Sequence, residues 1–257
     1  MPEPLYTLTN VSFSYPGNIP ALNNLDLTIG KGDRVALIGA NGTGKSTLLA
    51  VLDALQFPSS GTVEILGKTI TERTMNDAVF QRRFRSAIAF VFQNPDVQLF
   101  CPTVREDIIF GPLQLGVEKK EIYRRLDEVS SRLRITHLLD RSPFALSIGE
   151  KKKIAIASVL TIEPDVLLLD EATAGLDPRT TRDIMDVLAE EHAAGKTIIM
   201  ATHDLHILEE IADVIHVFGP DKKIIRSGSA EEILSDHEFL KENNLMHEHV
   251  SRFLHRL

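Results

Sequence analysis

Cysteine and long apolar runs are scarce in this sequence of 257 residues, and each scarcity excludes a class of protein. Cys101 is the single cysteine, so no intrachain disulfide can form, and a reducing, cytosolic compartment suits the chain. No apolar run approaches the roughly 20 residues that a membrane-spanning helix requires. We therefore expect that any work at a membrane depends on docking to another chain.

Basic residues are fewer than acidic ones, 28 against 36, so the formal net charge is −8. A negative chain has no broad attraction to nucleic acid or acidic lipid, so we expect no nucleic-acid partner. The first residues lack the basic start and the apolar core of a signal peptide. With 43% hydrophobic and 25% charged residues, the composition is that of an ordinary globular protein with one large domain or two lobes.

What the sequence does contain is the pattern of a phosphate-binding loop, Gly-Ala-Asn-Gly-Thr-Gly-Lys-Ser at 39–46, between a predicted strand at 35–38 and a predicted helix at 47–52. Glycines let backbone N–H groups surround an anion, and the start of the helix adds unpaired N–H groups. In this pattern the lysine binds the outer phosphates and the serine ligates Mg²⁺. A plain turn is the other interpretation, which the complete spacing and both flanking elements disfavour. The candidate nucleotide-binding residues here are Gly39, Ala40, Asn41, Gly42, Thr43, Gly44, Lys45, Ser46 and Thr47.

Buried strands and amphipathic helices alternate along most of the chain. Apolar runs predict further strands at 88–92, 166–169, 197–201 and 214–218. Apolar spacing predicts helices at 104–110, 118–133, 147–160, 180–193 and 205–212. This alternation predicts an α/β fold with a parallel, doubly wound sheet, and the mostly helical stretch at 94–162 is predicted to be an insertion. Alternating residues at 5–15 and 25–29 predict a small antiparallel sheet before it.

Three polar residues, Gln93, Asp170 and His203, come just past the ends of predicted parallel strands. Ligands of such sheets bind beyond the carboxyl ends of the strands. We therefore expect these three side chains to converge on the phosphate-binding loop.

An ordered set of motifs over residues ~5–230 resembles the ATP-binding-cassette (ABC) ATPases. The set comprises the phosphate-binding loop, Gln93, Leu-Ser-Ile-Gly-Glu at 146–150, Leu-Leu-Leu-Asp-Glu at 167–171, Gly-Leu-Asp at 175–177 and His203. The resemblance implies a P-loop NTPase fold with a mostly parallel RecA-like sheet, an N-terminal antiparallel β subdomain and an inserted α-helical subdomain. It also implies an ATPase domain at 1–230 and a C-terminal helical tail at 231–257.

Two further stretches resemble the ATPase subunits of energy-coupling-factor importers, the group serving cobalt, nickel and vitamins. They are Phe-Gln-Asn-Pro-Asp-Val-Gln-Leu-Phe at 92–100 and Val-Arg-Glu-Asp-Ile-Ile-Phe-Gly-Pro at 104–112. This resemblance implies an ATP-hydrolysing subunit at the cytoplasmic face of the cell membrane, using ATP and Mg²⁺. The implied partners are a transmembrane coupling subunit, a substrate-binding membrane subunit and a second ATPase subunit, identical or related.

The resemblance also implies roles for single residues. Glu171 is expected to polarise the attacking water, with Gln93 and His203 at the γ-phosphate. The expected Mg²⁺ ligands, direct or through water, are Ser46, Gln93 and Asp170. Tyr15 is expected to stack on adenine, with an ordinary sheet aromatic as the second interpretation. Two alternatives also stay open. Glu171 could be a charge of the metal site without a catalytic role, and His203 could be a histidine that contacts no ligand.

The Leu-Ser-Ile-Gly-Glu stretch departs from the usual family sequence Leu-Ser-Gly-Gly-Gln at Ile148 and Glu150. In the family this stretch covers the γ-phosphate of ATP bound to the opposite subunit, here through Ser147 and Gly149. Glu150 would bring negative charge toward that triphosphate unless it points away or caps the helix. The lysines at 151–153 are expected either to offset that charge or to form a solvated helix face.

Apolar residues are frequent between Gln93 and Pro112, at Val97, Leu99, Phe100, Val104, Ile108, Ile109 and Phe110. About half are expected in the core of the helical region. The others are expected to line a groove for a helix of the membrane subunit. On this hypothesis a charge at Leu99 or Phe100 prevents assembly without affecting ATP binding.

Two questions remain open from the sequence. The tail histidines His237, His247, His249 and His255 are interpreted either as a transition-metal regulatory site or as a polar helix face. The competing function is a soluble ABC ATPase acting on nucleic acid or ribosomes. Such proteins usually carry two cassettes or a long coiled-coil insertion, and this chain has neither. A small-molecule kinase would leave the motifs at 146–150 and 175–177 unexplained.

Overall fold

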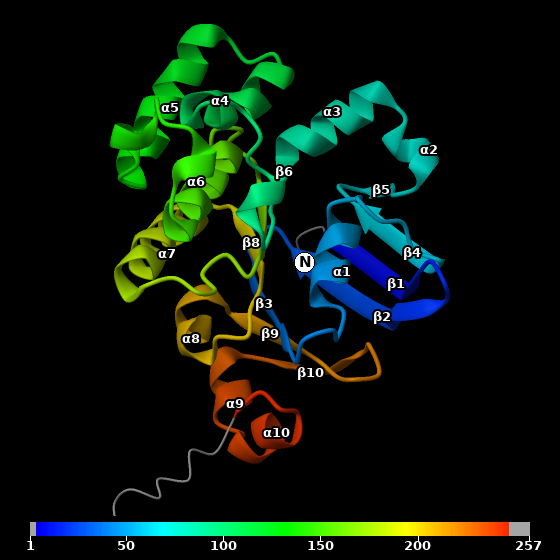
Figure 1. Ribbon diagram of the computed structural model, residues 1–257. Coiled ribbons are helices and arrows are strands. Elements are labelled where there is room, and N and C mark those ends of the chain that lie inside the picture. The colour runs from blue at the N-terminus through cyan, green and yellow to red at the C-terminus, as the bar shows by residue number, and fades with distance from the viewer. Residues whose placement is uncertain (1–3, 247–257) are drawn as a thin grey trace, which may run out of the picture.

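Two β-sheets and a group of helices make up the computed structural model, which describes residues 4–246 (Figure 1). The six-stranded sheet contains β3 (Arg34–Gly39), β6 (Ile88–Val91), β7 (Val166–Asp170), β8 (Thr197–Ala201), β9 (Val214–Phe218) and β10 (Ile224–Gly228). The four-stranded sheet contains β1 (Pro4–Tyr15), β2 (Ile19–Gly30), β4 (Ser60–Ile65) and β5 (Lys68–Thr69). The helices are α1 (Lys45–Leu52), α2 (Glu72–Met75), α3 (Ala78–Ala87), α4 (Val104–Gln114), α5 (Lys119–Arg132), α6 (Ile148–Leu160), α7 (Pro178–Ala193), α8 (Leu208–Ile211), α9 (Ala230–Leu234) and α10 (His237–Glu242).

The larger sheet has the strand order β10-β9-β3-β8-β7-β6 and is parallel except for β10, which pairs antiparallel with β9. Its parallel strands are short and apolar because both faces are covered, as the fully buried Val166–Asp170 illustrates. The register pairs Gly39 at the end of β3 with Phe218, and Asp170 at the end of β7 with Ala201. The ends of the parallel strands therefore meet at one edge, and the predicted mostly parallel sheet is confirmed.

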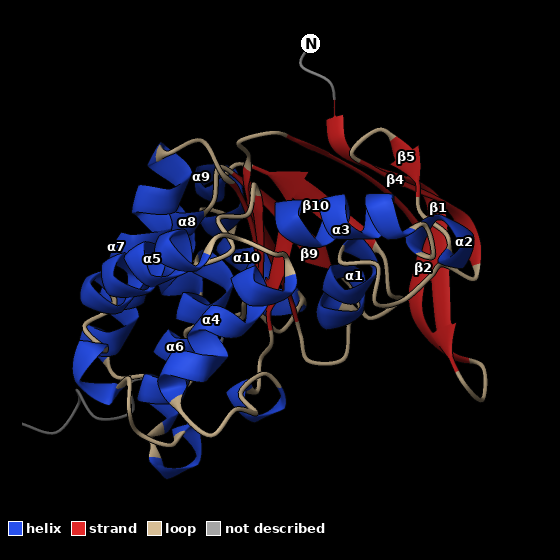
Figure 2. Ribbon diagram, turned by 90° about the horizontal axis from the view of Figure 1, so that it is seen from above, coloured by secondary structure: helices blue, strands red, loops and turns tan. Residues whose placement is uncertain are grey.

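The smaller sheet is antiparallel, in the order β2-β1-β4-β5, as the alternating residues of the N-terminal stretch predicted. The register of β1 shifts between Leu8 and Val11, where Asn10 adopts a positive φ of 50°. Such an irregularity re-aims the residues that follow. Figure 2 shows this sheet on one side of the molecule and most helices on the other.

The predicted helical insertion lies between β6 and β7 and contains α4, α5 and α6. α5 buries Ile122, Leu126 and Val129, the apolar stripe that its sequence predicts. α4 runs four residues beyond the predicted end at residue 110 and includes Pro112. Proline cannot donate to the carbonyl of Ile108, four residues before it, and the Thr161 hydroxyl donates to this carbonyl instead, at 2.8 Å. The helix predicted at 205–212 is instead a 3₁₀ turn, Leu205–Ile207, followed by the short α8.

The faces of the large sheet belong to two separate hydrophobic clusters. On β3, Ala36 and Ile38 join the cluster that includes the insertion, whereas Val35 and Leu37 join the cluster against α1 and the antiparallel sheet. This alternation is the two-residue period of a strand. Each buried aliphatic side chain contributes about 1.5–3 kcal/mol. The sheet is thus the structural element that holds both halves together.

The last described elements, α9 and α10, lie beside the larger sheet, with Ile233 and Leu240 buried in the first cluster. Ser229 caps α9 in a capping box with Glu232. No group of three or more histidine, cysteine, aspartate or glutamate side chains within residues 4–246 is arranged to hold a metal ion. Three of the four tail histidines, at 247, 249 and 255, lie outside the described residues, as does part of the helical tail predicted at 231–257.

An ion pair between a buried carboxylate and a partly exposed arginine joins α1 to α3. Asp53, at the end of α1, lies 2.9 Å from Arg85 and is almost fully buried beside the hydroxyl of Tyr6. Burial raises the pKa of the Asp53 carboxyl to about 6, and Arg85 opposes this rise. A carboxyl whose pKa is raised by folding contributes most to stability at low pH and loses that contribution as the pH rises through 6.

We predict that Arg85→Met lowers the free energy of unfolding by about 2–3 kcal/mol at pH 8, because it leaves a buried carboxylate without its partner. The loss should shrink at pH 5, where Asp53 takes up a proton. Urea unfolding at the two pH values measures this difference. In the Asp53→Asn background the pH dependence of the loss should disappear. Equal losses for Arg85→Met at both pH values would contradict this account.

Candidate functional site

The phosphate-binding loop joins the end of β3 to the start of α1, as the sequence predicted. Gly39 and Gly44 both have positive φ, at 153° and 112°. A side chain at Gly44 would collide with the backbone carbonyl of Ala21 on β2, so only glycine fits there. The loop is therefore folded tightly against the neighbouring strand, with the start of α1 directed at the space above it.

That space is a cavity of about 600 Å³. Its lining residues are Tyr15, Ile19, Pro20, Ala21, Asn41, Gly42, Gly44, Lys45, Ser46, Thr47, Gln93, Glu171 and Lys222. The Lys45 ammonium is buried and donates to the carbonyls of Gly39 and Ala40, at 2.7 and 3.2 Å. Burial lowers the pKa of Lys45, and the charges of Glu171 and Asp170 act in the opposite direction. The cavity thus contains the buried ammonium group and the backbone N–H donors that bind a polyphosphate.

Asp170 fits a divalent cation. Its carboxylate lies at the end of β7 beside Ser46, and its buried Oδ1 has no hydrogen-bond partner among the described residues. Burial raises the pKa of Asp170, an effect that Glu171 reinforces and that Ser46, Lys45 and Lys152 oppose. An unpartnered buried carboxylate oxygen beside a serine hydroxyl is the donor set that Mg²⁺ prefers.

Glu171 and His203 are brought together, since Nδ1 of the histidine lies 2.8 Å from Oε2 of the glutamate. Glu171 adopts a positive φ of 49°, which is sparsely populated for a residue with a side chain. Lys152 of α6 stabilises this turn by donating to the carbonyls of Glu171 and Ala174, at 2.7 and 2.8 Å. The sequence predicted the glutamate and the histidine, but it gave no sign that a buried lysine of α6 holds their loop.

Gln93 lies at the rim of the same cavity. A neighbouring glutamine, Gln98, connects this segment to α6: it accepts from the backbone N–H of Phe92 and donates to the carbonyl of Ala155 and the hydroxyl of Ser158. These three bonds tie the end of β6 to α6. The sequence predicted Gln93 at the nucleotide site and missed Gln98, whose amide can accept and donate hydrogen bonds at the same time.

Ser147 and Gly149 do not join the phosphate-binding loop. They line a separate cavity of about 300 Å³, together with Leu176, Asp177 and Thr180. Ser147 caps α6, and Oε2 of Glu150 accepts from the backbone N–H and the hydroxyl of Ser147, at 2.8 and 2.7 Å. The side chain of Glu150 therefore folds back as a helix cap, the arrangement that keeps it away from a ligand.

Both expectations for the three lysines that follow were wrong. Lys151 pairs with Asp96 at 2.7 Å, and Lys153 pairs with Asp183 at 2.6 Å. With Lys152 at the Glu171 loop, they tie α6 to three different segments. They are therefore neither a solvated face nor counter-charges of Glu150.

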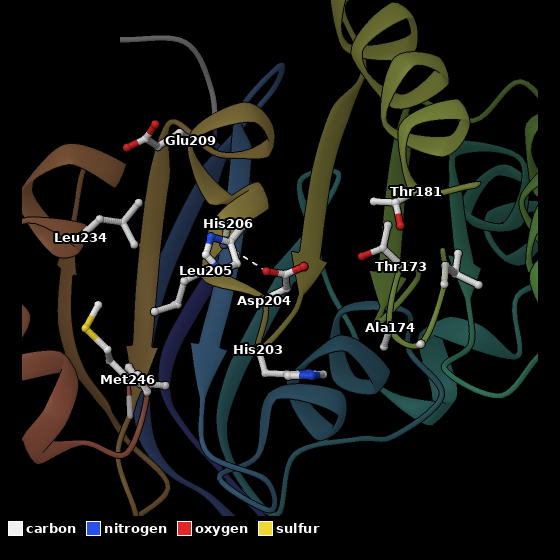
Figure 3. Close-up of a pocket in the computed structure, with 13 residues that line it drawn as sticks. Thr173, Ala174, Thr181, His203, Asp204, Leu205, His206, Glu209, Leu234 and Met246 are labelled. Carbon is white, nitrogen blue, oxygen red and sulfur yellow. Dashed lines mark hydrogen bonds between the residues drawn. The ribbon is translucent and has the colours of Figure 1, made fainter. Parts of the chain in front are cut away.

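A larger cavity of about 830 Å³ lies beside the site and is lined by His203 but by no residue of the phosphate-binding loop. Figure 3 shows His203, Asp204 and His206 between Thr173 and Thr181 on one side and Leu234 and Met246 on the other. The cavity with Lys45 and Ser46 is therefore the candidate nucleotide site. His203 reaches that site through Glu171.

Tyr15 also lines the nucleotide cavity, and its side chain is 39% exposed. Its hydroxyl lies 3.1 Å from the Thr47 hydroxyl, and its ring packs edge-on against Phe13. The tyrosine is thus fixed with ring surface open to solvent. Its stacking on adenine stays a prediction.

The fold and the site define a P-loop nucleoside-triphosphatase: a parallel sheet, a phosphate-binding loop before a helix, and carboxylates at the ends of neighbouring strands. The sequence model of the ABC transporter family matches residues 22–174. The chain belongs to the ABC transporter family and is an ATP-binding, ATP-hydrolysing component of a transporter. A small-molecule kinase is therefore not supported.

Named relatives agree with this assignment. The nickel import ATP-binding protein NikO of Rhodobacter capsulatus is 46% identical over 246 residues, 95% of this chain and 96% of the relative. The energy-coupling factor transporter ATP-binding protein EcfA2 of Streptococcus sanguinis is 39% identical over 257 residues, with coverage of 98% and 91%. The solved structure of cbiO1 from Clostridium perfringens, part of the ABC transporter complex cbiONQ, has a TM-score of 0.78 at 36% identity and covers 94% of this chain and 95% of its own.

We predict that Lys45→Ala weakens ATP binding by roughly 2–4 kcal/mol, because the variant loses the charge beneath the outer phosphates. Isothermal titration with ATP measures the loss, and Lys31→Ala, at an exposed lysine outside the cavity, serves as the matched control. Unchanged ATP affinity in Lys45→Ala would overturn the assignment of the loop.

Proposed function

We propose that this chain is the ATPase subunit of an energy-coupling-factor type importer for nickel or cobalt ions or for a vitamin. The observation that carries the proposal is the similarity to NikO, EcfA2 and cbiO1 over nearly the whole chain. The stretches at 92–100 and 104–112, which resemble that group, support the same conclusion. A pull-down from membranes, with identification of the co-purified chains and of any bound metal or vitamin, tests it.

Hydrolysis would use the groups at the ends of β7 and β8. ATP would place its phosphates on the loop at 39–47, with Lys45 at the outer phosphates. Ser46 and Asp170, with Gln93 at the rim, would hold Mg²⁺, which offsets phosphate charge when bound. Glu171 would orient and polarise the attacking water, and its contact with His203 fixes the direction of its carboxylate.

A second ATPase chain would complete the site. Ser147 and Gly149, which the resemblance assigns to the γ-phosphate, line a cavity apart from Lys45 and Ser46 of the same chain. The start of α6 supplies free N–H groups and the positive end of a helix dipole. This separation supports a dimer in which each ATP contacts the phosphate loop of one chain and the α6 start of the other.

The membrane subunit would dock on the helical insertion. None of the helices within residues 4–246 has the length and apolar character of a membrane span. We propose that attachment at the cytoplasmic face uses an apolar surface of the helical insertion. Val97, Phe100, Phe110 and Leu113 are exposed, and the rings of Phe100 and Phe110 pack edge-on at 4.9 Å. Such an apolar strip supports a helix-in-groove contact.

The expectation for Leu99 was wrong. Leu99, Val104 and Ile108 are at most 2% exposed and belong to the core cluster that includes α4 and α6. A charge at Leu99 would therefore damage the fold. Phe100 is 59% exposed, so a charge at this position can test docking while the fold stays intact. Asp107 orients this segment, because its Oδ1 accepts from the backbone N–H groups of Phe100 and Cys101.

For catalysis, we predict that Glu171→Gln binds ATP with little change in affinity while turnover falls by about 10²-fold or more, because the amide keeps the size and lacks the carboxylate. Steady-state phosphate release and direct titration separate the two effects. Glu209→Gln, an exposed carboxylate of the adjacent larger cavity, should keep normal turnover. Near-normal hydrolysis by Glu171→Gln would show that another carboxylate acts.

For docking, we predict that Phe100→Asp lowers recovery of the membrane partner by about tenfold, since a charge would be buried in an apolar contact. ATP affinity of the isolated subunit should not change. Tyr123→Asp, at a half-exposed aromatic of α5, is the matched control and should keep assembly. If Phe100→Asp assembles normally, the partner docks elsewhere.

A further inference from the structure

The turn between β9 and β10 lies directly beside the phosphate-binding loop. β9 and β3 are parallel neighbours, and their register ends with Gly39 opposite Phe218. The chain leaves β3 as the phosphate-binding loop and leaves β9 as the turn at 219–223, at the same edge of the sheet. Contact at this point is close, since a side chain at Gly39 would lie 2.8 Å from the carbonyl oxygen of Phe218.

This turn is also fixed from the other side by β2. The backbone N–H of Asn23 donates to the carbonyl of Lys222 at 3.1 Å, and the Asn23 side chain donates to the carbonyl of Asp221 at 3.3 Å. Within the turn, Lys222 itself has a positive φ of 65° and its N–H donates to Gly219. The backbone of the turn at Lys222 is therefore fixed both by β2 and by a hydrogen bond within the turn.

The Lys222 ammonium reaches the nucleotide cavity. It donates to the carbonyl of Gly42 in the phosphate-binding loop, and Lys222 lines the cavity with Tyr15, Lys45 and Thr47. Within residues 4–246 it takes part in no ion pair, in contrast to Lys151 and Lys153, each of which has a carboxylate partner. An ammonium has three donors, so donors remain for an anion beside the carbonyl.

We propose that Lys222 is a further nucleotide-binding residue, which acts on the phosphate chain of ATP from the side of the loop opposite Asp170 and Glu171. The inference rests on the proposed binding of ATP at residues 39–47. Lys45 would hold the phosphates from beneath, and Lys222 would add a second positive charge across the loop from the carboxylates. The ligand class it serves is a nucleoside polyphosphate, because the attraction grows with the number of phosphate charges.

The test compares the affinities of ATP, ADP and AMP for Lys222→Met and for the wild type, by titration calorimetry without divalent cations so that hydrolysis does not interfere. Lys223→Met is the matched control, since Lys223 lies in the same turn and does not line the cavity. We expect Lys222→Met to weaken ATP by about 5- to 10-fold, ADP by less and AMP by about twofold or less. Lys223→Met should change each affinity by less than about twofold, and Lys222→Arg should keep most of the ATP affinity.

Salt provides a second measure. The ATP affinity of the wild type should fall more steeply with KCl concentration than that of Lys222→Met, because the variant lacks a screened charge contact. Melting temperatures of all variants check that the fold is kept.

Three results would overturn the proposal. Equal losses of affinity for ATP, ADP and AMP would show that Lys222 supports the loop or contacts the nucleoside rather than the phosphates. Unchanged ATP affinity in Lys222→Met, or an effect that Lys223→Met reproduces, would remove the phosphate contact. Because Lys45→Ala tests the loop independently, a normal Lys222→Met beside a defective Lys45→Ala would reject this inference alone and leave the nucleotide site in place.

Discussion

The pairing register of the parallel strands is the constraint on which the rest of this structure depends. It ends β3 beside β9 and ends β7 beside β8, so the phosphate-binding loop, Asp170 and the segment with His203 begin at one edge. Because side chains alternate between faces with a period of two, a shift of one residue would turn Ala36 and Ile38 away from the helical insertion. Packing in the two hydrophobic clusters fixes the register, and the register positions the residues of the nucleotide site.

The second organising element is α6, which connects the nucleotide site to the helical insertion. Its three consecutive lysines each contact a different segment: the one that follows β6, the Glu171 loop and the buried Asp183 of α7. Gln98 adds hydrogen bonds from the end of β6 to the middle of the same helix. A change at the carboxyl edge of the sheet can therefore be passed to α6 through hydrogen bonds, and from α6 to α4 by packing. We propose this route for coupling ATP hydrolysis to the apolar strip around Phe100.

Much of the fold and of the phosphate site could be predicted from the sequence because both depend on local patterns. The loop at 39–46 and the apolar runs before Asp170 and His203 can be recognised from consecutive residues of the sequence. Contacts between distant segments could not be predicted in this way. The sequence around Lys152 does not show whether this lysine is exposed to solvent or buried at the Glu171 carbonyl. Likewise, Leu99 and Phe100 are adjacent apolar residues, and only Leu99 lies in the core. Such differences depend on three-dimensional packing, which one sequence does not reveal.

The central claim is that each ATP would be bound between two chains, since the Ser147 cavity and the Lys45 cavity are separate within one chain. The most direct test is the mass of the Glu171→Gln chain in solution, measured by sedimentation equilibrium with saturating ATP and with saturating ADP. The account predicts the mass of two chains with ATP and of one chain with ADP, because only the γ-phosphate joins the two halves. A single-chain mass with saturating ATP, in a variant shown to bind it, would contradict the account.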